Sequence, residues 1–292
     1  MGTDYVLMTD SDSDLPFALK EQYDIPVVYM PYALNGREYY DDLGQSLDHK
    51  SYFDAMRGGA VPVTSALNKQ NYLDYFEPVF KEGKDLLFVA FSSRLSMTLK
   101  EADAARKELL EQYPERKLVI VDTLSISAPM TLLVLKAHAM YREGKSLEEV
   151  ADWLTANRCR AQAYFTVDDL KYLRRGGRIS ATSAVMGSML DIKPIIVEAK
   201  DGTLQSLDKV RGRRRAVNYI VDKAAAAIRD PKESICLVLH ADAPEEAAHM
   251  KALLQEKQPE LEIRVEPIGP VIGAHCGPGT LAVAFMGGER PV

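Results

Sequence analysis

The sequence predicts an α/β protein in which a mostly parallel N-terminal sheet flanked by helices precedes a mixed α+β part. Apolar runs rich in Val, Ile and Leu alternate with helical patterns over the first half of the chain. The pattern changes after about residue 160, where an Asp-Gly pair separates two strand-like runs. The 292 residues suffice for two domains. We therefore expect an N-terminal α/β domain at 1–160 and a C-terminal α+β domain at 161–292.

The first domain begins with a buried strand, YVLMTD, that leads into the acidic segment DSDSD (10–14). Asp12 or Ser13 is expected to cap the helix that follows. Clustered carboxylates also bind Ca²⁺ or Mg²⁺, but this segment lacks the glycine and the distal Glu of an EF-hand loop, so we predict no metal site. In chain order, the expected strands are 5–10, 25–30, 86–91 and 118–122, and the expected helices are 51–56, 71–83, 98–113 and 128–144.

The second domain mixes hairpin and helix signals. Its expected strands are 162–167, a hairpin within 193–210, 234–241 and 262–269, with helices at about 213–229 and 244–257. The segment GPVIGAHCGPG (269–279) surrounds His275 with four glycines and two prolines. Glycine at this density disfavours helices and strands, so we expect a turn or loop there.

Composition excludes several functional classes. No run of about 18 apolar residues predicts a membrane helix, and the N-terminus lacks the pattern of a signal peptide. Cys159, Cys236 and Cys276 are too few and too widely spaced for a disulfide scaffold or a zinc site, so we expect a reducing cytoplasm. The net charge of -6 argues against general nucleic-acid binding.

Three hydroxyl-rich loops and one histidine are candidates for an anion site, the first of the loops being DSDSD (10–14). PVTSALN (62–68) and SSRLSMT (92–98) each precede a predicted helix, whose free N–H groups and dipole favour an anion. Thr64, Ser65 and Ser96 could add hydroxyl donors, although the same residue types also serve as ordinary helix caps. The imidazole of His275 could donate a further hydrogen bond, and the glycines beside it would let backbone approach a ligand.

Two other interpretations use these and further residues. Ser96 and His275 could act as nucleophile and base of an acyl hydrolase or acyltransferase, but no orienting carboxylate is identifiable and there is no GxSxG motif. Two basic clusters, KYLRRGGR (171–178) and KVRGRRR (209–215), could instead form a regulatory docking face for an acidic partner or a phosphate. Solvated helix ends would explain the same clusters without a function.

The candidate segments together resemble one family. The segments DSDSDL, PVTS, SSRLSMT, VDDLKYLRRGGRIS, IKPI, KVRGRRR and VIGAHCGPG follow one another in the order found in the DegV family of fatty-acid-binding proteins. The resemblance implies a lipid-binding carrier without catalysis or a cofactor, which holds one long-chain fatty acid in a buried tunnel. It also implies a partner, a dihydroxyacetone-kinase-like fatty acid kinase subunit. That partner would phosphorylate the acid to an acyl phosphate for phospholipid synthesis.

The resemblance assigns the head-group site. Thr64 and Ser65 match the family's TS motif, Ser96 matches the serine of its LSG motif, and His275 matches the histidine of its glycine-rich C-terminal motif. These side chains are expected to hold the carboxylate. Met97 stands where the family usually has the glycine of LSG, and Ala-Leu-Asn (66–68) stands where it usually has Gln-Pro-Ser.

The resemblance also implies a kinase-facing surface. Arg211 matches an arginine near the head group and the kinase interface, and Arg174 and Arg175 lie in a basic segment of the same kind. A monomer is the default expectation. A transient contact with a membrane surface is compatible with a lipid carrier, whereas nucleic acid is not an expected partner.

Overall fold

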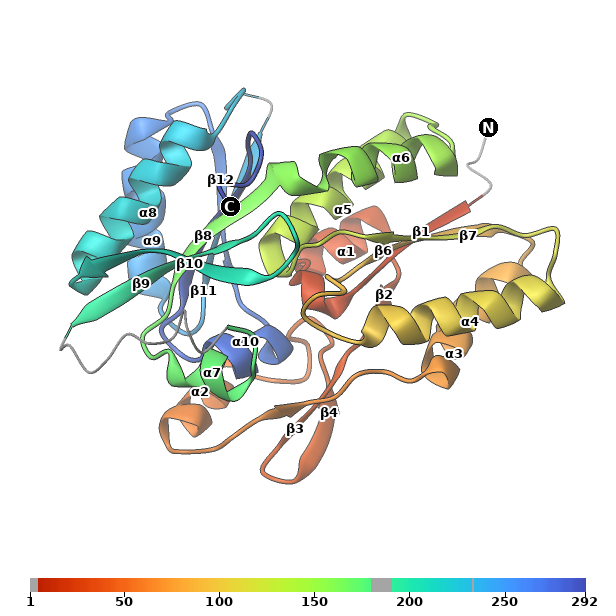
Figure 1. Cartoon of the computed structure of the whole chain (residues 1–292), viewed down its shortest axis with the longest axis horizontal. Coiled ribbons are helices and arrows are strands. Elements are labelled where there is room, and N and C mark those ends of the chain that lie inside the picture. The colour runs from red at the N-terminus through yellow and green to blue at the C-terminus, as the bar shows by residue number, and fades with distance from the viewer. Residues whose placement is uncertain (1–4, 180–190, 233) are drawn as a thin grey trace.

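Two β-sheets form the frame of the molecule (Figure 1). The computed structural model describes residues 5–179, 191–232 and 234–292, so Ser180, the last residue of the basic segment 167–180, lies outside the described residues. A four-stranded parallel sheet has the order β2-β1-β6-β7, and a six-stranded mixed sheet has the order β10-β9-β8-β13-β11-β12. A small third sheet has the order β4-β3-β5. The predicted fold class is confirmed, while the domain boundary near residue 160 stays a prediction.

The secondary-structure elements agree closely with most of the predicted ranges. The strands are β1 (Tyr5–Asp10), β2 (Val27–Val28), β3 (Pro31–Leu34), β4 (Arg37–Tyr40), β5 (Val63–Thr64), β6 (Asp85–Ala90), β7 (Leu118–Asp122), β8 (Ala161–Thr166), β9 (Ile192–Glu198), β10 (Leu204–Arg211), β11 (Ile235–His240), β12 (Glu262–Pro267) and β13 (Leu281–Met286). The helices are α1 (Phe17–Tyr23), α2 (His49–Arg57), α3 (Lys69–Lys81), α4 (Thr98–Gln112), α5 (Ser127–Arg142), α6 (Leu147–Asn157), α7 (Lys171–Arg175), α8 (Arg213–Ala227), α9 (Pro244–Lys257) and α10 (Pro270–Cys276), with short 3-10 helices η1 (Ser11–Ser13) and η2 (Arg158–Arg160).

The parallel sheet is buried on both faces, as its nearly continuous apolar strands require. Along β6, Leu86 and Phe88 face a core shared with α3 and α4. The alternate residues Leu87 and Val89 face a second core shared with α1, α5 and α6. No helix within the described parts of the chain combines the length and the apolar character needed to cross a bilayer.

The mixed sheet has one face against helices and one face against the N-terminal part. Val283 and Phe285 of β13 pack in the core that α8 and α9 cover. Ala282 and Ala284, which point the other way, belong to the core that also contains side chains of β6, α3 and α4. Small side chains on this inner face leave space between the two sheets, and the candidate ligand site lies there.

Two local predictions were wrong. The segment around His275 forms helix α10 instead of a loop, packed against α2 and α7 (Figure 1). Close packing explains its glycines, because a Cβ at Gly273 would lie 2.8 Å from the ring of Phe53. The carboxylate of Asp10 accepts a hydrogen bond from the backbone N–H of Asp12 and caps η1, so neither Asp12 nor Ser13 has the predicted capping role. Helix α1 begins later, after Pro16.

A buried ion pair joins the C-terminal segment to the mixed sheet. The guanidinium of Arg290 lies 2.8 Å from the carboxylate of Glu198, and the two side chains are 0% and 2% exposed. Arg290 also donates to the carbonyl oxygens of Ala161 and Ala199, while Glu198 accepts from the N–H of Ile126. Burial raises the pKa of Glu198 to about 7, and the neighbouring guanidinium opposes that rise.

Replacing Arg290 by Ala should destabilise the protein strongly at pH 8, because it leaves the buried carboxylate of Glu198 without its cation. We expect the free energy of unfolding to fall by about 3–5 kcal/mol in urea denaturation. Glu289→Ala is the matched control, because Glu289 forms an ion pair with Lys200 at an exposed position and its loss should cost at most about 1 kcal/mol. Equal effects of the two substitutions would contradict this account of the pair.

Candidate functional site

A cavity of about 230 Å³ lies between the parallel sheet and the mixed sheet. Its walls are mainly apolar and come from both parts of the chain; among them are Phe91, Ile126, Phe165, Leu239, Ala282 and Ala284. Ser65 and Met97 line the cavity and are exposed, whereas Glu198 lines it and is buried. The cavity therefore has an open end near Ser65 and Met97 and an enclosed end near Glu198.

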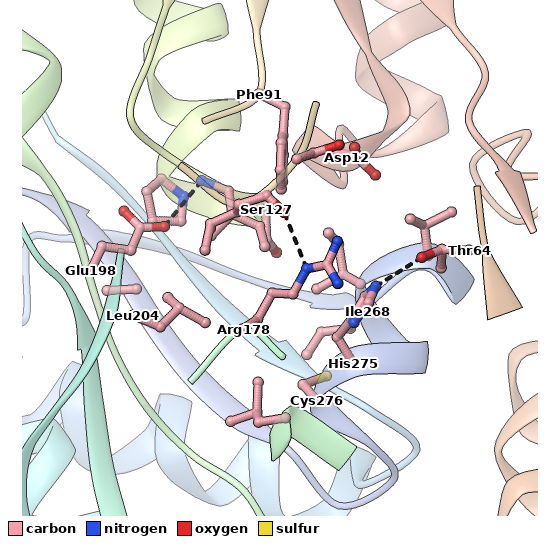
Figure 2. A pocket seen from close by; sticks show the side chains of 18 of the residues that line it. Asp12, Thr64, Phe91, Ser127, Arg178, Glu198, Leu204, Ile268, His275 and Cys276 are labelled. Carbon is pink, nitrogen blue, oxygen red and sulfur yellow. Dashed lines mark hydrogen bonds between the residues drawn. The ribbon is translucent and has the colours of Figure 1, made fainter. Parts of the chain in front are cut away.

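The four predicted head-group residues all line this cavity. Thr64 ends the short strand β5, Ser65 follows it, Ser96 precedes α4, and His275 lies in α10. The hydroxyl of Thr64 and Nε2 of His275 are 2.9 Å apart and hydrogen-bonded. Figure 2 shows this pair on the side of the cavity opposite Glu198. The fold thus gathers residues that are 211 positions apart in the chain.

The surroundings of His275 favour the neutral imidazole. Burial, and to a smaller degree the positive charges of Arg178 and Arg175, together lower its pKa to about 4. Nδ1 is buried and has no hydrogen-bond partner within the described residues. The backbone at Gly176 approaches this nitrogen so closely that a Cβ there would lie 2.3 Å from it, so only glycine fits. A neutral ring carries one N–H, and Nε2, which contacts Thr64, is the nitrogen that does not lie against the backbone of Gly176.

Ser96 and Met97 form the other edge of the opening. Oγ of Ser96 accepts a hydrogen bond from the N–H of Thr98 at 3.3 Å, at the start of α4. Met97, the N-cap residue of α4, makes no side-chain cap and is 60% exposed. Met97, which stands where the resemblance implies a glycine, therefore lies at the exposed rim of the cavity.

The predicted docking arginines do not line the cavity. Arg174 and Arg175 lie in α7 and Arg211 ends β10, and all three are exposed. Arg178, from the same basic segment, does line the cavity, and its Nε donates to the carbonyl oxygen of Leu95 at 3.1 Å. Gly177, with φ of 68°, reverses the chain after α7 and so directs Arg178 inward.

Three further charged side chains line the cavity, namely Arg178, Asp12 and Glu198, and none of them was predicted as a head-group residue. The glycine pair before Arg178 was a usable signal for a reversal of the chain. Burial raises the pKa of Asp12 above its ordinary value, and the charges of Asp10, Asp41 and Asp14 raise it further. In the described parts of the chain, no three His, Cys, Asp or Glu residues are arranged to hold a metal ion.

The geometry does not favour the serine hydrolase interpretation. The ring of His275 bonds Thr64 through Nε2, and its Nδ1 meets no carboxylate within residues 5–179, 191–232 and 234–292. Ser96 is bonded to backbone instead of to the imidazole. A nucleophilic serine needs a base within hydrogen-bond reach and a group that orients that base.

Fold and cavity together define a protein with two packed sheets and a mainly apolar cavity, open at one end, between them. A family model described as "Uncharacterised protein, DegV family" matches residues 5–287. A DegV domain-containing protein of Clostridium perfringens is 38% identical over 286 residues, which cover 98% of each chain. Another from Lactococcus lactis is 34% identical over 96% of each chain. The chain belongs to the DegV family.

Solved structures of related proteins show the same fold. A DegV family protein from Thermus thermophilus, described as binding fatty acid, is 29% identical and superposes with a TM-score of 0.87 over 98% of this chain and 100% of that one. DegV from Bacillus subtilis, described as a fatty acid binding protein, is 27% identical with a TM-score of 0.83 over 98% of this chain and 100% of that one. Fatty acid binding is thus described for two relatives that share this fold.

The low pKa of His275 predicts a pH-dependent contribution to stability. The unfolded chain takes up a proton on this residue near pH 6.5 and the folded protein only near pH 4, so acidification between these values favours unfolding. His275→Gln removes this effect. We expect the stability of the wild type relative to His275→Gln to decrease as the pH falls from 7 to about 4.5, measured by urea denaturation at several pH values. A constant difference would show that His275 is not held neutral.

Proposed function

We propose that this chain binds one long-chain fatty acid, with the acyl tail in the cavity and the carboxylate at its open end. The observation that carries the proposal is the cavity itself, which is apolar along its walls and has hydroxyls and a neutral imidazole at one end. This polarity matches that of a fatty acid. The fatty acid binding described for the relatives from Thermus thermophilus and Bacillus subtilis supports the same ligand.

The two ends of the site contribute differently to binding. A carboxylate that leaves water needs hydrogen-bond donors, and Thr64, Ser65, Ser96 and His275 can supply them. Arg178, in the same cavity, contributes a compensating positive charge. Each buried methylene of the tail contributes roughly 0.8 kcal/mol, so the tail supplies most of the affinity. The head-group residues chiefly fix where the carboxylate lies.

We further propose that the chain is a carrier that presents this carboxylate to a dihydroxyacetone-kinase-like fatty acid kinase subunit. The exposed arginines support such docking. Arg214 and Arg215 are exposed in the first turn of α8, where the helix dipole disfavours cations and an anionic partner would compensate. Arg213, by contrast, already forms an ion pair with Glu246 at 2.9 Å. The chain itself has no catalytic role in this proposal.

The fatty acid proposal is tested by native mass spectrometry of the protein after incubation with a mixture of fatty acids. We expect one acid per chain, because the tail fills a single cavity. Ala282→Leu, which narrows the inner wall of the cavity, should shift the bound population towards shorter chains, with circular dichroism as the control for folding. A protein that stays empty with every acid would contradict the proposal.

The docking proposal predicts a separable effect of surface charge. Replacement of Arg174, Arg175 and Arg211 together by Glu should weaken binding to the kinase subunit by roughly tenfold or more, because like charges then face each other across the interface. Fatty acid content should not change, since these side chains lie outside the cavity. Lys232→Glu, an exposed charge reversal elsewhere, is the matched control in a pull-down. Unchanged kinase binding by the triple variant would remove the proposal.

A further inference from the structure

One side chain of the cavity wall does not suit a plain hydrocarbon tail. Asp12, in the 3-10 helix η1, is 3% exposed and lines the same cavity as Thr64 and Arg178. Its Oδ1 is fully buried and has no hydrogen-bond partner in the described parts of the chain. Figure 2 shows Asp12 beside Phe91 at the edge of the cavity. A carboxyl group buried in this position needs a hydrogen-bond partner.

The neighbouring aspartates differ from Asp12 because their carboxyl groups accept hydrogen bonds that join separate segments of the fold. Asp10 accepts hydrogen bonds from the N–H groups of Asp12 and Phe91, both at 3.1 Å. Asp14 accepts from the N–H of Gly269 at 2.8 Å and from the hydroxyl of Ser127. These two carboxyl groups tie η1 to β6, α5 and α10. Oδ1 of Asp12 has no comparable structural bond, so the fold alone does not explain it.

Glu198, the other acidic side chain of the cavity wall, is also accounted for. It forms an ion pair with Arg290 and accepts a hydrogen bond from Ile126. Oε2 of Glu198 also lacks a hydrogen bond of good geometry within the described residues, but the guanidinium of Arg290 lies 2.8 Å from it, whereas Asp12 forms no ion pair among these residues. A buried polar atom without a partner costs about 1–3 kcal/mol, and a purely hydrocarbon ligand offers no group that would offset this cost.

The charges around Asp12 restrict what its partner can be. A cationic group on the ligand would meet the guanidinium of Arg178 in the same cavity. A metal ion would need more ligands than the surroundings offer, since the described residues contain no suitable group of three. A neutral hydroxyl meets neither obstacle. It can donate to a carboxylate and can also accept from a protonated carboxyl group, so it suits either form of Asp12.

We propose that the cavity is built for an oxygenated acyl chain, a fatty acid with a hydroxyl group that hydrogen-bonds to Asp12. This inference rests on the proposed fatty acid binding and specifies the class of acid. Arg178 and the Thr64–His275 pair hold the carboxylate, and Asp12 recognises a second polar group along the chain. The surrounding apolar side chains take up the remaining methylenes.

The inference is tested by competition binding with the full-length, delipidated protein. Stearic acid and a series of hydroxystearic acids, with the hydroxyl at carbon 2, 3, 10 or 12, displace a fluorescent fatty acid. We expect at least one hydroxystearic acid to bind about fivefold or more tightly than stearic acid, because a satisfied buried carboxyl group gives discrimination of this order. Equal or weaker binding of the whole series would overturn the inference.

Two substitutions of Asp12 locate the effect. Asp12→Val removes the hydrogen-bonding group at similar volume, and it should abolish the preference while stearic acid binds as well as before or more tightly. Asp12→Asn keeps a donor and an acceptor and should retain most of the preference. The inference is wrong if Asp12→Val leaves the ratio of the affinities for hydroxystearic acid and stearic acid unchanged. Asp12 would then form no hydrogen bond with the ligand hydroxyl.

The possible failures are distinguishable. Tight binding of stearic acid without any preference for a hydroxyl removes this inference and leaves the proposed function intact. Failure of every acid to displace the probe removes both. If Asp12→Val does not fold, as judged by circular dichroism, the wild-type comparison and Asp12→Asn still decide the outcome.

Discussion

The hydrogen bond between Thr64 and His275 is the contact around which the ligand site is organised. It joins strand β5 of the small sheet to helix α10 near the C-terminus, and so closes one side of the cavity between the two large sheets. Several features hold α10 in place for this contact, among them the bond from Gly269 to Asp14 and the close approach of Gly176 to the imidazole. Burial keeps that imidazole neutral, so it can share a hydrogen bond without introducing a buried charge.

Much of the fold could be predicted from the sequence because apolar periodicity and tertiary burial agree there. The segment 5–10 and the segment 118–122 are strands with the predicted bounds. The β3–β4 hairpin was missed although Asn35 and Gly36, both with positive φ, are a recognised hairpin signal. Helix α10 could not be predicted from local propensity. Its glycines are unfavourable for a helix in isolation, but packing against Phe53 and Tyr172 requires them.

Only some residues of the candidate site could be predicted from the sequence. Thr64, Ser96 and His275 could be proposed together because each follows or lies within a recognisable motif. Arg178 and Asp12 were predicted only as members of a basic and an acidic segment. The glycine pair signals a reversal before Arg178, but it does not show which side chains then face the cavity. That direction depends on the reversal at Gly177 and on the short helix η1, both of which are set by tertiary packing. Glu198 carried no motif, and its partner Arg290 lies 92 positions away.

The central claim is that one fatty acid lies in the cavity with its carboxylate between Thr64, Ser96 and His275. Nuclear magnetic resonance of palmitic acid labelled with ¹³C at the carboxyl carbon tests it most directly. The account predicts one labelled carbon signal per chain, shifted from that of the free acid, and a further change of its position in Thr64→Val and in His275→Gln. A carboxyl signal that titrates like the free acid in water and ignores both substitutions would contradict it.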